Sequence, residues 1–227
     1  MYSELEQALG YAYQNRQLLQ TALSHTSYAN EACHDALKSY ERLEFLGDSI
    51  LGFVTADYLY RMFPTKLEGE LTRIRAELVC EANLAAVAVQ LHLGDYLLLG
   101  KGEEHGGGRA RSGTLCDVME ALIAAAFLDG GLEAASGIIH RHILPQLEKV
   151  IASHDYKTEL QELVQRKRDQ KLSYALLEER GPDHCKEFFI CVSLNGTPVG
   201  EGTGSSKKRA EQSAAADALR RLYGQVL

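Results

Sequence analysis

Acidic and apolar residues are interleaved in the stretch ERLEFLGDSI, residues 41–50. Carboxylates can bind hard cations or transfer protons, so their spacing matters. On a helix, Glu41, Glu44 and Asp48 fall on one side, because they are spaced i, i+3 and i+7. The expected opposite, apolar side consists of Leu43, Leu46, Ile50 and Phe53. The pattern therefore predicts either a solvated acidic face or a functional site, and Phe45 and Leu51 narrow the polar face.

A second pair of acids lies in LCDVMEALIAAAFL, residues 115–128. Apolar residues surround this predicted helix, which is typical of a buried helix. Its only charges, Asp117 and Glu120, are spaced i and i+3 and therefore share a face. A buried carboxylate must be paired, protonated or bound to a metal. Ion pairs with Arg73 or Arg75 are the alternative to a functional site here.

Together, Glu44, Asp48, Asp117 and Glu120 would form a pocket of oxygen ligands. Such a pocket selects hard cations, of which Mg²⁺ is the usual choice. Carboxylate-held Mg²⁺ serves phosphoryl chemistry, because it activates water and neutralises charge on the phosphate. His140 and His142 are spaced i, i+2 on a predicted helix and should point apart, so we do not expect them to be ligands.

The last predicted helix opens with a basic cluster, in the stretch GTGSSKKRAE, residues 202–211. Cations at a helix N-terminus oppose the helix dipole. A bound phosphate reverses that effect, since the free N–H groups and the Lys charges then face an anion. Lys207 and Lys208 are thus better placed for nucleic acid than for folding alone, although a solvated basic turn is the alternative.

The sequence predicts two domains to carry these residues: a helical domain for the acids and a smaller domain of helices and strands for the basic cluster. Residues 1–152 show helical periodicity, interrupted by a segment rich in glycine and charge, residues 99–113, which we expect to be a mobile loop. Helix should resume near Thr114 and stop at Gly130-Gly131. Residues 153–157 are the expected linker. Residues 158–227 predict an order of α-β-β-β-α, with a capping box from Thr158 to Gln161 and a hairpin at Asn195-Gly196.

Composition sets outer limits on the function. The 227 residues are 45% apolar and carry a net charge of −7, and we expect no apolar run to be long enough to cross a membrane. Residues 1–156 hold 12 basic and 21 acidic residues, whereas residues 157–227 hold 12 and 10, so the balances are −9 and +2. No signal peptide is evident at the start. The five cysteines form no C-x-x-C pair, which favours reduced thiols in the cytoplasm.

The motifs resemble those of the ribonuclease III family. ERLEFLGDSIL is similar to the signature helix of that family, and the resemblance continues through LSHTSYANE, FPTKLEGELTRIRAELV, the glycine-rich loop and LCDVMEALIAAAFLDGG. The tail resembles the double-stranded RNA-binding domain that follows the nuclease domain in bacterial members. The resemblance implies an all-α nuclease domain followed by a small α+β RNA-binding domain.

The resemblance also implies roles for individual residues. Glu44, Asp117 and Glu120 match Mg²⁺ ligands, with Mn²⁺ as a substitute ion, and Asp48 and Glu120 match catalytic acids. Glu41 and Glu68 match accessory acids, Glu41 at a subunit boundary, although solvated acids would look the same. The residues implied in RNA binding are Gln161, Glu162, His184, Ser205, Ser206, Lys207 and Lys208.

By this resemblance, the chain should be a cytoplasmic, homodimeric, Mg²⁺-dependent endonuclease of double-stranded RNA, with no membrane partner. It should leave 5′-phosphate and 3′-hydroxyl ends and process precursors of ribosomal RNA and messenger RNA. One alternative is a regulatory protein that binds double-stranded RNA without cutting it. A weaker alternative is a metal phosphohydrolase acting on small nucleotides, for which the C-terminal domain would have no use.

Overall fold

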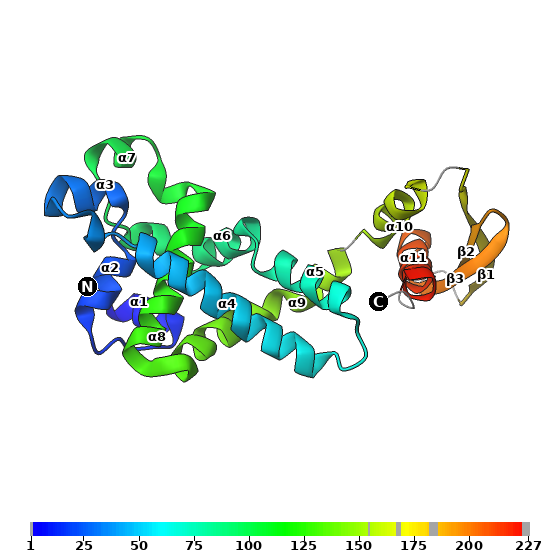
Figure 1. The fold of residues 1–227 in the computed structure, drawn as a ribbon, viewed down its shortest axis with the longest axis horizontal. Coiled ribbons are helices and arrows are strands. Elements are labelled where there is room, and N and C mark those ends of the chain that lie inside the picture. The colour runs from blue at the N-terminus through cyan, green and yellow to red at the C-terminus, as the bar shows by residue number, and fades with distance from the viewer. Residues whose placement is uncertain (1, 154, 167–168, 182–185, 224–227) are drawn as a thin grey trace. The chain divides into compact units, whose positions relative to one another are not determined.

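The structure is a computed structural model that describes residues 2–153, 155–166, 169–181 and 186–223. The chain divides into two compact units, Met1–Ala152 and Ser153–Leu227. The first unit is mostly helical (Figure 1). Its α-helices are α1 Ser3–Leu9, α2 Arg16–Ala22, α3 Thr26–Tyr28, α4 Glu41–Met62, α5 Glu68–Leu78, α6 Glu81–Gln90, α7 Lys101–His105, α8 Ser112–His142 and α9 Leu147–Ser153, the last of which ends at the boundary of the units.

Helices α4 and α8 form the centre of the first unit and pack against each other (Figure 1). Every residue of α8 from Thr114 to Ala126 is buried except the half-buried Asp117. Leu51 of α4 and Leu122 of α8 are both fully buried in the same apolar core. Because α8 is apolar on all sides in this stretch, its neighbours surround it and fix where its two acids lie.

The buried side of α4 differs from the predicted one. Leu43 and Ile50 are buried as expected, but the Phe53 side chain is 60% exposed and Leu51 is completely buried. The prediction for Phe53 was therefore wrong. The buried row of α4 includes Gly47, Leu51 and Val54, and Gly47 faces the Glu120 backbone of α8, so Phe53 lies off this row and faces outward.

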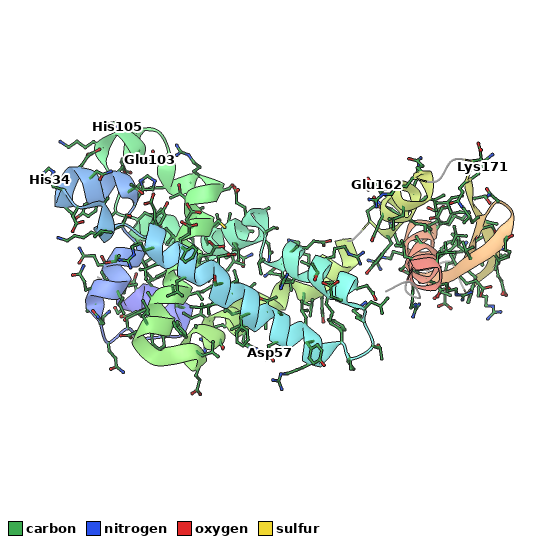
Figure 2. All side chains as sticks on the ribbon, in the orientation of Figure 1. His34, Asp57, Glu103, His105, Glu162 and Lys171 are labelled. Carbon is green, nitrogen blue, oxygen red and sulfur yellow. The ribbon has the colours of Figure 1, made fainter. Side chains whose placement is uncertain are left out.

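The prediction of a mobile loop at residues 99–113 was also wrong, since this segment contains α7 and a 3₁₀ turn, Gly108–Ala110. Charged pairs order it despite its glycines. The Arg109 guanidinium pairs with Glu104 at 2.6 Å and donates to the carbonyls of Gly94 and Leu97, both at 2.8 Å. Glu103 and His105 project from α7 in Figure 2.

One expectation for α8 is confirmed and one needs correction. The helix stops at Gly131, as predicted, because the φ of 77° and ψ of −172° of that residue are non-helical, and a second helical segment then runs on to His142. Contrary to the expectation from the sequence, the stretch Ser112–Ile151 is long and apolar enough to cross a membrane, by length and composition only. A helix buried in the core of a globular protein can have the same length and composition, and α8 contributes buried residues to the core.

The second unit has the predicted α-β-β-β-α order (Figure 1). Its three strands are β1 Leu172–Arg180, β2 Glu187–Leu194 and β3 Thr197–Gly204, and they form an antiparallel sheet in the order β1-β2-β3. Asn195 and Gly196, both with positive φ, form the predicted tight turn between β2 and β3. Helix α10, Tyr156–Gln165, precedes the strands in the chain, and helix α11, Lys207–Tyr223, follows them.

Two glycines let the sheet of the second unit approach its last helix. A Cβ at Gly200 or Gly202 would lie only 2.5 or 2.1 Å from backbone atoms of α11. Helix α10, the first helix of the second unit, begins at Tyr156 and not at the predicted residue 158, so its start lies inside the expected linker. The predicted capping box at Thr158 was wrong, because Asp155 is the cap and its carboxylate accepts from the Thr158 amide at 3.0 Å.

Candidate metal centre and nucleic-acid interface

Helix α4 carries three of the predicted acids over its first two turns. Glu41 and Glu44 lie in the first turn, where negative charge is favourable next to the helix dipole. Glu44 is partly buried, whereas Glu41 and Asp48 are exposed. The Glu41 carboxylate accepts a hydrogen bond from the Thr26 hydroxyl at 3.0 Å, which ties α4 to α3.

Helix α8 supplies Asp117 and Glu120. Asp117 is partly buried, and Glu120 is only 8% exposed. The two helices meet next to these acids, because a Cβ at Gly47 of α4 would lie 2.0 Å from the carbonyl oxygen of Glu120. The absence of a side chain at Gly47 thus brings the acids of α4 close to those of α8.

The Glu120 carboxyl lies within electrostatic reach of the other three acids. Burial and then, in decreasing order of effect, the charges of Asp48, Glu44 and Asp117 raise the pKa of Glu120 to about 8. Burial, followed by the charges of Asp117, Glu41 and Asp48, also raises the pKa of Glu44. Within the part of the chain that the structure describes, no Lys or Arg forms an ion pair with any of the four. The alternative of neutralisation by Arg73 or Arg75 is therefore not supported.

Helix α8 also carries three side chains whose possible metal-ligand atoms lie close together. One ligand atom each from Cys116, Asp117 and Glu120 lies within 4.8 Å of the others. The Cys116 Sγ lies 4.0 Å from the Glu120 carboxylate, and burial beside these acids raises the pKa of the thiol to about 12. A protonated thiol is a poor ligand for a hard cation, so the carboxylates are the donors that suit one.

Asp117 has a neutral partner. The Tyr40 hydroxyl donates to its Oδ2 at 3.2 Å, and this bond opposes the rise in the pKa of Asp117 that burial causes. The negative charge of this group, whose member Glu120 is buried, fits a divalent cation held by oxygen ligands.

The contacts that the structure gives Glu68 are with residues outside this group of acids. It begins α5 and accepts from the Thr72 hydroxyl at 2.7 Å. It also lines a hollow of about 470 Å³ with Phe53, Tyr60 and Arg75. The structure therefore does not join Glu68 to the acid group of α4 and α8.

The second unit presents its predicted RNA-binding residues on α10 and at the start of α11. Gln161 and Glu162 are exposed on α10, where Figure 2 labels Glu162. A Lys157–Glu211 ion pair at 2.8 Å ties α10 to α11. His184 lies outside the described residues.

The start of α11 is built to display positive charge. The Ser206 hydroxyl accepts from the Arg209 amide at 3.2 Å, and the Arg209 guanidinium donates to the Ser205 hydroxyl at 3.0 Å. Lys207 and Lys208 are exposed. The Lys207 ammonium lies 5.9 Å from the centre of the Phe188 ring, a weak cation–π contact that restrains its position.

Comparison with known proteins gives the same division of the chain. A ribonuclease-III-like family model matches residues 15–147, and a double-stranded RNA binding motif matches residues 156–222. Ribonuclease 3 of Pelotomaculum thermopropionicum is 48% identical over 218 residues, covering 95% of this chain and 90% of that protein. The chain belongs to the ribonuclease III family. Ribonuclease 3 of Listeria innocua is 44% identical and covers 97% of both chains.

A solved structure confirms the fold of the nuclease unit. The nuclease domain of ribonuclease III from Campylobacter jejuni is 39% identical, with a TM-score of 0.59, and covers 64% of this chain and 97% of that one. The chain is thus an endoribonuclease of the ribonuclease III family, specific for double-stranded RNA. The alternatives of a non-cutting RNA-binding protein and a small-nucleotide phosphohydrolase do not fit this assignment.

Sequence reasoning missed three residues of this ribonuclease III site. Gly47 carried a signal, since glycine inside a helix costs about 1 kcal/mol relative to alanine and indicates close packing. Cys116 lies in the predicted motif, but a lone thiol gave no reason to place it beside Glu120. Tyr40 carried no signal, because its partner Asp117 is 77 residues away in the sequence.

Proposed function

We propose that the chain cleaves double-stranded RNA with Mg²⁺ held by Glu44, Asp117 and Glu120. The observation that carries this proposal is the buried Glu120 carboxylate, which has three acidic neighbours and no cationic partner in the described residues. A divalent cation would offset that repulsion, and Mn²⁺ should substitute because it accepts the same oxygen ligands. When bound, the cation supplies an activated water and neutralises charge on the phosphate.

The acids would then have two roles, metal binding and proton transfer. Glu44, from α4, and Asp117 and Glu120, from α8, would hold the cation between two rigid helices. Asp48 is exposed on the turn after Glu44, so its carboxylate can accept a proton from the attacking water. Glu120 also serves as a catalytic acid in this proposal. Breakage of the bond between phosphorus and O3′ would leave 5′-phosphate and 3′-hydroxyl ends.

The RNA-binding unit would hold the duplex. Lys207 and Lys208 would contact phosphates, and the first turn of α11 with Ser205 and Ser206 would add hydrogen-bond donors. Gln161 and Glu162 would contact ribose hydroxyls in a minor groove, as suits recognition of A-form RNA by shape. His184 belongs to this proposal by resemblance alone.

We also infer a homodimer through the nuclease unit. Phe45, Phe53 and Tyr60 are 77%, 60% and 73% exposed and follow one face of α4, and such a row of large apolar side chains favours burial by a partner. The solved Campylobacter jejuni nuclease domain is described as flexible in a region involved in dimer formation. Glu41 and Glu68 are then accessory acids, Glu41 at the subunit boundary. Precursors of ribosomal RNA and messenger RNA in the cytoplasm are the proposed substrates.

The test is Glu120→Gln in a gel assay with a long RNA duplex, with and without Mg²⁺. Glutamine keeps the shape but removes the charge that holds the cation. We expect cleavage by the parent only with Mg²⁺, almost no cleavage by the variant, and equal RNA binding by both. Glu133→Gln, an exposed acid of the same helix, is the matched control and should cleave normally. Comparable cleavage by Glu120→Gln and the parent would refute the assigned role.

A further inference from the structure

Tyr40 connects the two helices that carry the acids. It is 3% exposed and lies directly before α4. Its carbonyl accepts hydrogen bonds from the amides of Leu43 and Glu44, both at 2.8 Å, and so starts the first turn of the helix. Its hydroxyl donates to the Asp117 carboxylate of α8 at 3.2 Å. One residue thus fixes the backbone of one acid and the side chain of another.

Other contacts hold Tyr40 in this place. Its amide donates to the Ser24 carbonyl at 2.9 Å. The His25 ring meets the Tyr40 ring edge to face, with 5.7 Å between centroids and an interplanar angle of 67°. His25 is itself held, because its amide donates to the Leu98 carbonyl at 3.0 Å. The hydroxyl therefore has little freedom to move away from Asp117.

The direction of the hydrogen bond matters for metal binding. A carboxylate without a donor can rotate, and Asp117 has no other side-chain donor among the described residues. The Tyr40 hydroxyl binds Oδ2 and so restricts that rotation, which leaves lone pairs on Oδ1 for a ligand. Hydrogen-bond donors behind ligating carboxylates commonly change metal affinity by about 10- to 100-fold when they are removed.

We propose that Tyr40 is a positioning residue of the metal centre, whose hydroxyl orients Asp117 and whose backbone sets the turn that carries Glu44. This inference rests on the function proposed above. It differs from a packing role, because packing depends on the aromatic ring and the positioning role depends on the hydroxyl.

The experiment uses Tyr40→Phe in the full chain, which keeps the ring and removes the hydroxyl. The matched control is Tyr13→Phe. Tyr13 is also buried, and its hydroxyl donates to α8 as well, to the Leu122 carbonyl at 2.9 Å, but it contacts none of the acids of the metal centre. Both variants lose one buried hydrogen bond to the same helix, so a general loss of stability should affect them alike.

The first readout is binding of Mn²⁺ in the absence of RNA, followed by the electron paramagnetic resonance signal of the free ion. We expect Tyr40→Phe to weaken Mn²⁺ binding by about 10-fold and Tyr13→Phe to leave it within about 2-fold of the parent. The Mg²⁺ concentration for half-maximal cleavage should rise by the same factor for Tyr40→Phe. The KM for RNA at saturating Mg²⁺ should not change.

The outcomes separate this inference from the proposed function. If the parent binds Mn²⁺, Glu120→Gln does not and Tyr40→Phe binds as tightly as the parent, the role of Tyr40 is overturned and the metal site stands. An equal loss of affinity in Tyr13→Phe would also overturn it, because the effect would then be structural. If the parent itself binds no Mn²⁺, both proposals fail.

Discussion

The contact between Gly47 and the Glu120 backbone allows a sharp test of how the site is assembled. In Gly47→Ala, the new Cβ would lie 2.0 Å from the Glu120 carbonyl oxygen and 2.5 Å from its carbonyl carbon. Real Cβ contacts essentially never fall below 3.0 Å, so the helices must separate by roughly 1 Å. A side chain could rotate away from the methyl group, but these atoms are backbone atoms of a buried helix.

Two opposing terms set the change in stability. Alanine in place of a helical glycine stabilises a helix by about 1 kcal/mol. Overpacking of a core costs about 1–3 kcal/mol, and a backbone-to-backbone clash should fall at the upper end. We therefore expect Gly47→Ala to lower the free energy of unfolding by roughly 2 kcal/mol. A shift of about 1 Å between Glu44 and Glu120 should lower the cleavage rate by on the order of 100-fold.

The assay combines urea unfolding with single-turnover cleavage of an RNA duplex at saturating Mg²⁺. Gly137→Ala is the control, since Gly137 is an exposed helical residue of α8 with no atom within 4 Å of a Cβ there. That variant should gain about 1 kcal/mol in stability and keep its cleavage rate. If Gly47→Ala is as stable as the control and cleaves like the parent, the close approach of the two helices does not position the acids.

Two further predictions concern charge. With a chelator present, the parent should lose stability as the pH rises from about 4.5 towards 8. The reason is that Glu120 has a pKa of about 8 in the folded chain against an ordinary value of 4.5, so the folded chain binds more protons than the unfolded chain in this range. Urea unfolding of Glu120→Gln should show a much smaller loss of stability over the same pH range. Lys207→Ala with Lys208→Ala should weaken RNA binding and reduce the slope of log affinity against log salt by about 2, and an unchanged slope in filter-binding titrations would contradict phosphate contacts.

The acid positions could be predicted from the sequence because helical periodicity is local. Spacings of three and four residues place Glu44 with Asp48, and Asp117 with Glu120, on single faces. The apolar surroundings of Glu120 predicted its burial, and burial requires compensation for its charge. The α-β-β-β-α order followed in the same way from local signals such as Asn195-Gly196.

What the sequence could not show depends on contacts between distant segments. Phe53 has the periodicity of a core residue, but which apolar residues of α4 become buried depends on where α8 crosses it. The order of residues 101–110 arises from Arg109 bonding to carbonyls of a neighbouring turn, which outweighs the freedom of the glycines. Asp155 replaces Thr158 as the cap because its carboxylate also accepts from Gln212 of α11 at 2.8 Å, a contact 57 residues away.

A chain with a net charge of −7 must still bind a polyanion, and the distribution of its charge explains how. The acids of α4 and α8 repel one another, and the raised pKa of Glu120 shows that the folded site favours neutralisation by a proton or a cation. A cation at this site would remove repulsion between the nuclease unit and RNA at the point of cleavage. The start of α11 has no such requirement, because Lys207 and Lys208 are positive at any Mg²⁺ concentration that the enzyme meets. The affinity lost in the double lysine variant should therefore be the same with and without Mg²⁺, once the total ionic strength is matched.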